Sequence, residues 1–321
     1  VQSLLVKTVT VPSVTTLSWT YPSASCSVQK YSAGCPFTRV GSSVTVAVQP
    51  VRKEEASRFG LLKTNAEGRI IDFKEKPKDP VILESMKSSD DPDRPFLGSM
   101  GIYIFDTDLL VDILSTKDYS DFGNNVIPYA IDHSDVFGWS FDDYWEDIGT
   151  IRSFYETNLA LTNDKPPFNF YDPKHPIYTI ATTMPSAKVF NSRLDHVLIA
   201  RGARVKAESV ERSIVGVMSY IDTGTVIKNS IIMGAENEKY ILQADQNSDE
   251  IGVKIGIGKN CFIENAIIDK NARIGNNVVI KAFPAGAELD DPNEVKRYYV
   301  RDGIVVIPKN AVIESDTVIE P

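Results

Sequence analysis

A six-residue repeat in the C-terminal third constrains the fold of this 321-residue chain more than any other feature. Aliphatic side chains recur every six positions in four runs, which are Val215, Ile221, Ile227 and Met233; Ile251, Ile257 and Ile263; Ile268, Ile274 and Ile280; and Ile307, Ile313 and Ile319. A hexapeptide repeat predicts a parallel β-helix in which each step forms one face of a prism and its aliphatic side chain points inward. We expect the polar stretches 236–249 and 283–297 to leave the coil as loops.

Residues 44 to 162 show strand and helix patterns of an α/β domain. Apolar runs predict strands at 44–50 and 99–105 and a hairpin of residues 60–63 and 69–73. Helices are expected after Asp106 or Thr107, which serve as caps, and at about 151–162. Asp147 lies just before the second helix, where an acid either caps the helix or binds a metal or phosphate ligand.

The sequence predicts three segments, with boundaries at 1–43, 44–184 and 185–321. Residues 1–53 contain no Asp or Glu, and the Ser-, Thr- and Val-rich stretch 1–43 shows neither a helical period nor a clear strand spacing. We interpret 1–43 as an unmatched and disordered leader, an organellar transit segment or the start of a fragment. Adjacent Glu75 and Lys76 end the predicted hairpin, and in extended backbone their side chains would diverge.

Composition narrows the function classes. A net charge of −9 argues against binding to nucleic acid through phosphate neutralisation. The sequence has no run of 18 apolar residues, so we expect no membrane partner. Its cysteines are too few and too widely spaced for a disulfide framework or a zinc site, which favours a reducing compartment.

In order along the chain, the segments FGLLKTNAEGRIIDFKEKPKDP, SMGIYIF, DFGNNVIP, YWEDIGTIRSFYETNLAL and IIDKNARIGNN resemble those of the ADP-glucose pyrophosphorylase family. The resemblance covers the chain from about residue 44 to its end. It implies a partial Rossmann-like nucleotidyltransferase domain of the α/β class, followed by a left-handed parallel β-helix. It also implies the conversion of ATP and glucose 1-phosphate to ADP-glucose and pyrophosphate, in the bacterial cytoplasm or the plastid stroma.

The resemblance assigns roles to residues of this chain, which are Gly60, Glu75, Lys76, Ser99 and Trp145 for glucose 1-phosphate, Lys76 and Asp147 for catalysis, Asp147 for Mg²⁺, and Lys309, Arg301 and Lys281 for a phosphorylated effector. A lysine can neutralise the sugar phosphate, a carboxylate can accept hydrogen bonds from sugar hydroxyls, and a glycine allows close backbone approach. The family also implies a homo- or hetero-tetramer.

One family feature is missing from these residues. The family's Gly-rich loop, which binds the ATP phosphates, has no GGxGTR-like counterpart here, so we expect this chain to be inactive alone. For the same reason we expect the strands 44–50 and 99–105 to lack sheet neighbours and the isolated chain to be poorly stable. One alternative is a non-catalytic regulatory or scaffold subunit. Another is a hexapeptide acyltransferase, but none of its candidate bases, His133, His175 and His196, lies in a clean hexad run.

Overall fold

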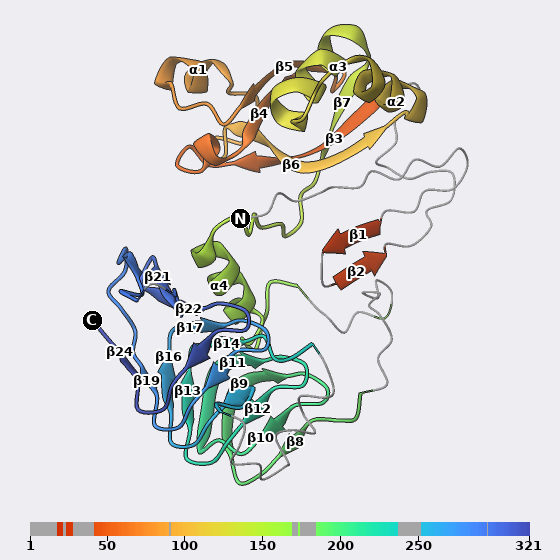
Figure 1. Ribbon diagram of the computed structural model, residues 1–321. Coiled ribbons are helices and arrows are strands. Elements are labelled where there is room, and N and C mark those ends of the chain that lie inside the picture. The colour runs from red at the N-terminus through yellow and green to blue at the C-terminus, as the bar shows by residue number, and fades with distance from the viewer. Residues whose placement is uncertain are drawn as a thin grey trace. The chain divides into compact units, whose positions relative to one another are not determined.

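The computed structural model describes residues 18–21, 24–27, 42–89, 91–168, 173, 184–236, 252–293 and 295–321. By their contacts the residues form two units, 1–144 with 170–181 and 145–169 with 182–321 (Figure 1). This division differs from the predicted boundary between 184 and 185, because residues 145–169 and 182–184 group with the β-helix. Within the described ranges, no helix is both long and apolar enough to cross a membrane.

The first unit is built on one five-stranded mixed sheet. Its strand order is β5 (Ile70–Glu75), β4 (Gly60–Thr64), β6 (Phe96–Phe105), β3 (Val44–Val51) and β7 (Val136–Ser140). All pairs are antiparallel except β3 with β7. The predicted strands and hairpin are therefore confirmed. The expectation that strands 44–50 and 99–105 lack neighbours is wrong, since β3 and β6 are both inner strands.

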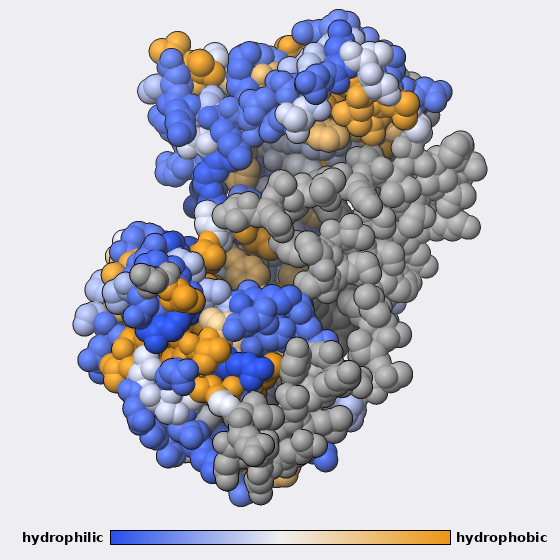
Figure 2. All heavy atoms as spheres, viewed as in Figure 1, coloured by the Kyte–Doolittle hydropathy of each residue, from blue (hydrophilic) through white to orange (hydrophobic). Residues whose placement is uncertain are grey.

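Helices and short turns cover this sheet. They are η1 (Ala56–Arg58), α1 (Pro80–Ser85), α2 (Thr107–Thr116), η2 (Phe122–Val126) and α3 (Ile127–His133). The Asp106 side chain caps α2 by accepting from the backbone N–H groups of Asp108 and Leu109, which confirms one of the two predicted caps. Figure 2 shows hydrophobic side chains at the surface of α1 and α2, where Val81 and Val111 are exposed.

Two short strands lie in the N-terminal segment that we interpreted as an unmatched leader. Strands β1 (Ser18–Tyr21) and β2 (Ala24–Ser27) pair antiparallel, with Tyr21 opposite Ala24. These strands were not predicted, because two four-residue strands give only a minimal alternation of side chains.

The second unit is a parallel β-helix with one flanking helix, α4 (Ile151–Ala160) (Figure 1). Its first face consists of β8 (Lys188–Val189), β10 (Arg204–Val205), β12 (Tyr220–Ile221), β15 (Gly256–Ile257), β18 (Arg273–Ile274) and β23 (Val312–Ile313). The long strands β9 (Arg193–Ile199) and β11 (Ser209–Val215) run through the other two faces. The second face continues with β13 (Val226–Lys228), β16 (Phe262–Glu264), β19 (Val279–Ile280) and β24 (Val318–Ile319), and the third with β14 (Ile231–Ile232), β17 (Ala266–Ile268) and β22 (Ile304–Ile307).

The predicted hexad positions form the core of this prism. Eleven of them are at most 3% exposed: Val215, Ile221, Ile227, Ile257, Ile263, Ile268, Ile274, Ile280, Ile307, Ile313 and Ile319. Met233 is only half-buried, because Ile232 takes the inward position in that coil. Ile251 lies outside the described residues. The repeat therefore predicted the β-helix correctly.

A second aliphatic column lies on the outside of the third face. Ile214, Ile231, Ile267 and Val306 are in register on successive strands, each directly before an inward-facing residue. Side chains alternate along a strand, so this column points away from the core. Tyr155 and Leu159 of α4 pack on it and are at most 8% exposed, so the outer column holds α4 on the β-helix.

The two predicted loops differ in what the structure describes. Of the stretch 236–249, only Glu236 lies within the described residues. The stretch 283–297 does leave the coil, and it leads into an antiparallel pair, β20 (Leu289–Asp290) with β21 (Tyr299–Arg301), which extends the third face beside β22. Asp291 in this excursion is fully buried and accepts hydrogen bonds from Asn293 and Arg297.

Candidate functional site

The Glu75 side chain at the end of β5 lies where two glycines leave room for it. Gly60 is its register partner on β4, and a Cβ placed on Gly60 would be 2.5 Å from Phe73 Cζ and 2.7 Å from Glu75 Oε2. Gly123 of η2 encloses the same group, since a Cβ there would be 2.4 Å from that oxygen. Real Cβ atoms do not approach this closely, so the two glycines allow the carboxylate to occupy this position.

Lys76 does not diverge from Glu75 as extended backbone would require. Its φ of 44° lies in the left-handed region, which is uncommon for a residue other than glycine. The backbone N–H of Lys76 donates to Phe59 O at 3.1 Å, and its Nζ lies 3.8 Å from Glu75 Oε1. The prediction of diverging side chains is therefore wrong, because β5 ends at Glu75 and the chain turns. A strained residue held by its surroundings is a frequent feature of functional sites.

Ser99 lies on the same row of the sheet as Glu75 and Gly60. The register of β4 with β6 pairs Leu61 with Gly98, and one further residue along places Gly60 beside Ser99. Residues in one row share a face of the sheet. Gly60 lies between Glu75 and Ser99 in this row, so no side chain stands between the Glu75 carboxylate and the Ser99 hydroxyl. Ser99 Oγ lies 3.4 Å from the Tyr103 hydroxyl and accepts from the Gly101 N–H at 3.3 Å.

The Tyr103 hydroxyl and the Asp121 carboxylate lie close enough to Glu75 to interact with it electrostatically. Burial raises the pKa of Glu75; the Lys76 ammonium opposes the rise, and the Asp121 carboxylate adds to it. Burial likewise raises the pKa of Tyr103, with the Ser99 hydrogen bond lowering it and the charges of Glu75 and Asp121 raising it. Asp121 Oδ1 accepts from the Asn124 N–H at 2.6 Å at the start of η2. We name Gly60, Glu75, Lys76, Ser99, Tyr103, Asp121 and Gly123 the Glu75 site.

Sequence reasoning missed three members of the Glu75 site, Tyr103, Asp121 and Gly123. Tyr103 follows Ser99 by four residues on β6, and its ring stacks on Phe122 with 5.8 Å between the centroids. The segment DFG at 121–123 was part of the family resemblance, and an acid followed by a glycine was the available signal. What the site can do is accept hydrogen bonds from hydroxyl groups beside one flexible cation.

Trp145 and Asp147 belong to the second unit, directly ahead of α4. Both are half-buried. The Asp147 carboxylate lies against the Gly149 backbone, since a Cβ there would be 3.2 Å from Oδ1 and 3.3 Å from Oδ2. Lys76 belongs to the first unit, and its convergence with Asp147 stays a prediction.

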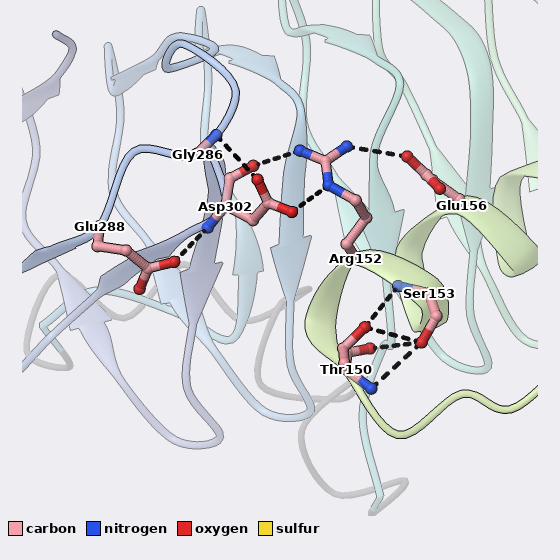
Figure 3. A network of polar contacts seen from close by, with 7 residues as sticks. All are labelled: Thr150, Arg152, Ser153, Glu156, Gly286, Glu288 and Asp302. Carbon is pink, nitrogen blue, oxygen red and sulfur yellow. Dashed lines mark hydrogen bonds and ion pairs between the residues drawn. The ribbon is translucent and has the colours of Figure 1, made fainter. Parts of the chain in front are cut away.

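The interpretation of Asp147 as a helix cap is wrong. Thr150 caps α4, with its Oγ1 accepting from the Ser153 N–H at 3.1 Å and Ser153 Oγ accepting from the Thr150 N–H at 3.2 Å (Figure 3). This reciprocal pair satisfies two backbone donors that a helix start leaves open. The capping role at the start of α4 therefore belongs to Thr150 and Ser153.

The three predicted effector cations each form an ion pair with a different partner. Lys309 Nζ lies 2.7 Å from Glu236 Oε2, and Lys281 Nζ lies 2.7 Å from Glu320 Oε2. Arg301 Nη2 lies 2.6 Å from Asp290 Oδ1. Lys309 lies between β22 and β23, whereas Lys281 follows β19, so these two occupy different corners of the prism.

No group of three or more potential metal ligands from His, Cys, Asp and Glu is present in the described part of the chain. Mg²⁺ differs from zinc in this respect, because it is commonly bound by one or two carboxylates together with substrate phosphates and water. Asp147, half-buried and beside Gly149, fits such a site as a single protein ligand.

Comparison with family models agrees with this architecture. Residues 35–164 match the family described as nucleotidyl transferase. Residues 182–318 match the one described as the GLGC left-handed parallel beta-helix domain. The first match contains the Glu75 site and α4, and the second contains the described coils of the prism. The chain therefore combines a nucleotidyl transferase segment with a GLGC-type left-handed β-helix, and this combination matches the architecture of the ADP-glucose pyrophosphorylase family.

Proposed function

We propose that the Glu75 site binds α-D-glucose 1-phosphate. The observation that carries this proposal is the enclosure of the Glu75 carboxylate by Gly60 and Gly123, which holds an acceptor in a fixed place for sugar hydroxyls. The hydroxyls of Ser99 and Tyr103 add donors and acceptors on the same strand. The Lys76 ammonium, on a side chain 63% exposed, is free enough to reach a phosphate.

The proposed reaction is the attack of a phosphate oxygen of glucose 1-phosphate on the α-phosphorus of ATP, which gives ADP-glucose and pyrophosphate. Phosphoryl transfer of this kind depends on positioning and on neutralising charge, with no need for a covalent nucleophile. Mg²⁺ would supply charge neutralisation on the phosphates, and Asp147 would hold it. Lys76 would hold the sugar phosphate.

The nucleotide half of this reaction needs donors for the ATP phosphates. The 321 residues contain no GGxGTR-like run. We therefore propose that this chain binds the sugar phosphate and does not form ADP-glucose on its own. Robust ATP-dependent formation of ADP-glucose by the purified chain would contradict this part of the proposal.

Titration calorimetry with α-D-glucose 1-phosphate tests the binding proposal. We expect saturable binding that is weakened at least about tenfold by Lys76→Met, which corresponds to about 1.4 kcal/mol. Lys74→Met is the matched control, because Lys74 is also on the Glu75 strand but pairs with Asp72 at 3.0 Å. Absence of binding, or equal affinities for Lys76→Met and Lys74→Met, would reject the Glu75 site.

The second candidate function is a regulatory subunit that binds an anionic effector. It is favoured by the pairing of Lys309 and Lys270 with one carboxylate, Glu236, at Nζ–O distances of 2.7 and 3.7 Å. A sugar phosphate or phosphoglycerate would compete with Glu236 for these two lysines. A chain with this function alone would bind such an effector and show no heat with glucose 1-phosphate. Sedimentation of the chain alone and with an intact catalytic subunit would test the proposed homo- or hetero-tetramer.

A further inference from the structure

The first turn of α4 is attached to the β-helix by one arginine. Arg152 Nε donates to Asp302 Oδ2, and Arg152 Nη2 donates to the Asp302 backbone oxygen at 2.7 Å (Figure 3). A guanidinium held at two points keeps its orientation, which a lysine would not. Its remaining nitrogen, Nη1, donates to Glu156 of the same helix at 2.8 Å.

Asp302 is itself held in place by the turn that carries it. Its Oδ1 accepts from the Gly286 N–H at 2.8 Å, and its own N–H donates to Glu288 Oε1 at 2.8 Å. Glu288 Oε2 lies 3.6 Å from Arg301 Nε. Asp302 has a φ of 52°, a region in which Asp and Asn are tolerated better than most residues. Arg152 therefore contacts a preorganised carboxylate.

The residues predicted for the site in the second unit, Trp145 and Asp147, lie a few positions ahead of Arg152 in the chain. The Asp147 carboxylate rests on Gly149, Gly149 precedes the cap residue Thr150, and Arg152 is the second residue of α4. These positions all lie in the second unit. Whatever fixes the first turn of α4 also fixes the backbone on which Asp147 rests.

We propose that Arg152, through Asp302, is a positioning residue that holds the segment 145–147 in the orientation needed for substrate binding. The inference rests on the proposed function, because it takes Trp145 and Asp147 as parts of the glucose 1-phosphate and metal site. It goes beyond that function by naming a turn of the β-helix as the support of this segment. The Arg152 hydrogen bond also lowers the pKa of Asp302.

Trp145 provides a local readout of this segment that does not depend on substrate, and the affinity for substrate provides the functional one. The chain has three tryptophans, so Trp19→Phe with Trp139→Phe leaves Trp145 as the only one. In this background we compare Arg152→Lys, Asp302→Asn and the control Glu156→Gln, which removes only the contact within α4. Acrylamide quenching of Trp145 and the affinity for α-D-glucose 1-phosphate are measured for each.

We expect Arg152→Lys and Asp302→Asn to raise the quenching constant of Trp145 about twofold and to weaken glucose 1-phosphate binding about fivefold. The double variant should be no worse than either single one, because both remove one interaction. Glu156→Gln should leave both quantities unchanged. If Arg152→Lys does not fold, Asp302→Asn decides, since asparagine suits the left-handed position.

Unchanged Trp145 quenching in both variants, or an equal change in Glu156→Gln, would overturn the inference. If the parent chain shows no glucose 1-phosphate binding, the proposed function fails, while the Trp145 quenching still decides the positioning role. If the parent binds and the variants bind equally well with unaltered quenching, the positioning role fails and the proposed function stands.

Discussion

Glu75 and Gly123 come from separate segments of the first unit, and a methyl group on Gly123 would lie 2.4 Å from Glu75 Oε2. Gly123→Ala is therefore expected to displace the carboxylate without changing any charge. Since Gly123 lies in η2 and has no left-handed φ, alanine suits the backbone there and stability should change little. We predict about tenfold weaker binding of glucose 1-phosphate, measured by calorimetry.

Gly138→Ala is the control for this substitution. Gly138 lies on β7 of the same sheet, and its added Cβ would contact Thr64 Cγ2 at 3.3 Å, remote from any carboxylate. An affinity loss in Gly138→Ala equal to that in Gly123→Ala would assign the effect to general strain in the sheet.

Glu75→Gln should raise the stability of the folded chain at pH 7 while weakening the binding of glucose 1-phosphate. Burial raises the pKa of Glu75 in the folded chain, outweighing the opposing charge of Lys76, so the ionised carboxylate disfavours the folded state. The stabilising contribution of the protonated form is fully present below the unfolded pKa of 4.5 and is lost as pH rises through the higher folded pKa. At pH 7 the uncharged amide should thus unfold at higher urea concentration than the parent, yet bind glucose 1-phosphate at least about tenfold more weakly.

Urea unfolding at pH 4 and pH 7 checks the sign of this effect. The stability difference between Glu75→Gln and the parent should be larger at pH 7 than at pH 4. The opposite order would mean that the ionised carboxylate stabilises the first unit.

The β-helix was predictable from sequence, whereas the attachment of α4 was not. The inward hexad positions repeat along one chain segment, so a single periodicity shows them. The outward column consists of Ile214, Ile231, Ile267 and Val306, each of which is the first residue of an aliphatic pair whose second residue points inward. In the sequence each pair resembles any other short stretch of strand. Only the structure shows that α4 (Ile151–Ala160), which precedes every member of the column by more than a whole coil of the β-helix, covers this column.

The Glu75 site was predictable only in part, for a similar reason. Gly60, Glu75, Lys76 and Ser99 lie in recognisable motifs, but their spacing says nothing about which other segments close around them. Asp121 and Gly123 reach Glu75 through the packing of η2 on the sheet, a contact between distant residues. The turn at Lys76 was missed because its left-handed backbone runs against the extended pattern of β5.

Tyr155→Phe should weaken the attachment of α4 to the β-helix. The Tyr155 hydroxyl donates to the Asn229 backbone oxygen at 2.6 Å, and the side chain is 8% exposed. Removing the hydroxyl leaves that acceptor without this donor in a largely buried place, which costs about 1 kcal/mol of unfolding free energy. Chemical denaturation followed by circular dichroism measures it, with Tyr119→Phe in the first unit as control. A loss below that of the control would mean that the Tyr155 hydroxyl does not contribute to holding α4 on the β-helix.

The same tyrosine has a spectroscopic signature. Burial raises the pKa of Tyr155 to about 12. An ultraviolet titration of the parent minus Tyr155→Phe should therefore show one phenol that ionises near pH 12, above the ordinary value of 10. A difference signal centred near pH 10 would contradict the burial of this hydroxyl.

Asp291 should make the stability of the stretch 283–297, which leaves the β-helix coil, sensitive to acid. Burial alone would raise the pKa of this carboxyl, but the hydrogen bonds from Arg297 and Asn293 outweigh burial and hold it well below its ordinary value of 3.8. Its stabilising effect is therefore present above pH 3.8 and is lost as the pH falls towards the lower folded pKa. We predict that Asp291→Asn costs about 2 kcal/mol at pH 7, because hydrogen bonds to a charged group are lost at a buried position.

The pH dependence of unfolding isolates this one carboxyl from the others. Between pH 4 and pH 2.5 the parent should lose stability more steeply than Asp291→Asn, by at most about 1.4 kcal/mol per pH unit, the value for one proton. Asp316→Asn is the control, because Asp316 also accepts a side-chain hydrogen bond, from Asn277 at 2.8 Å, but at an exposed corner. Parallel pH profiles for the parent and Asp291→Asn would show that Asp291 is not ionised in the folded chain, and that Arg297 is paired in some other way.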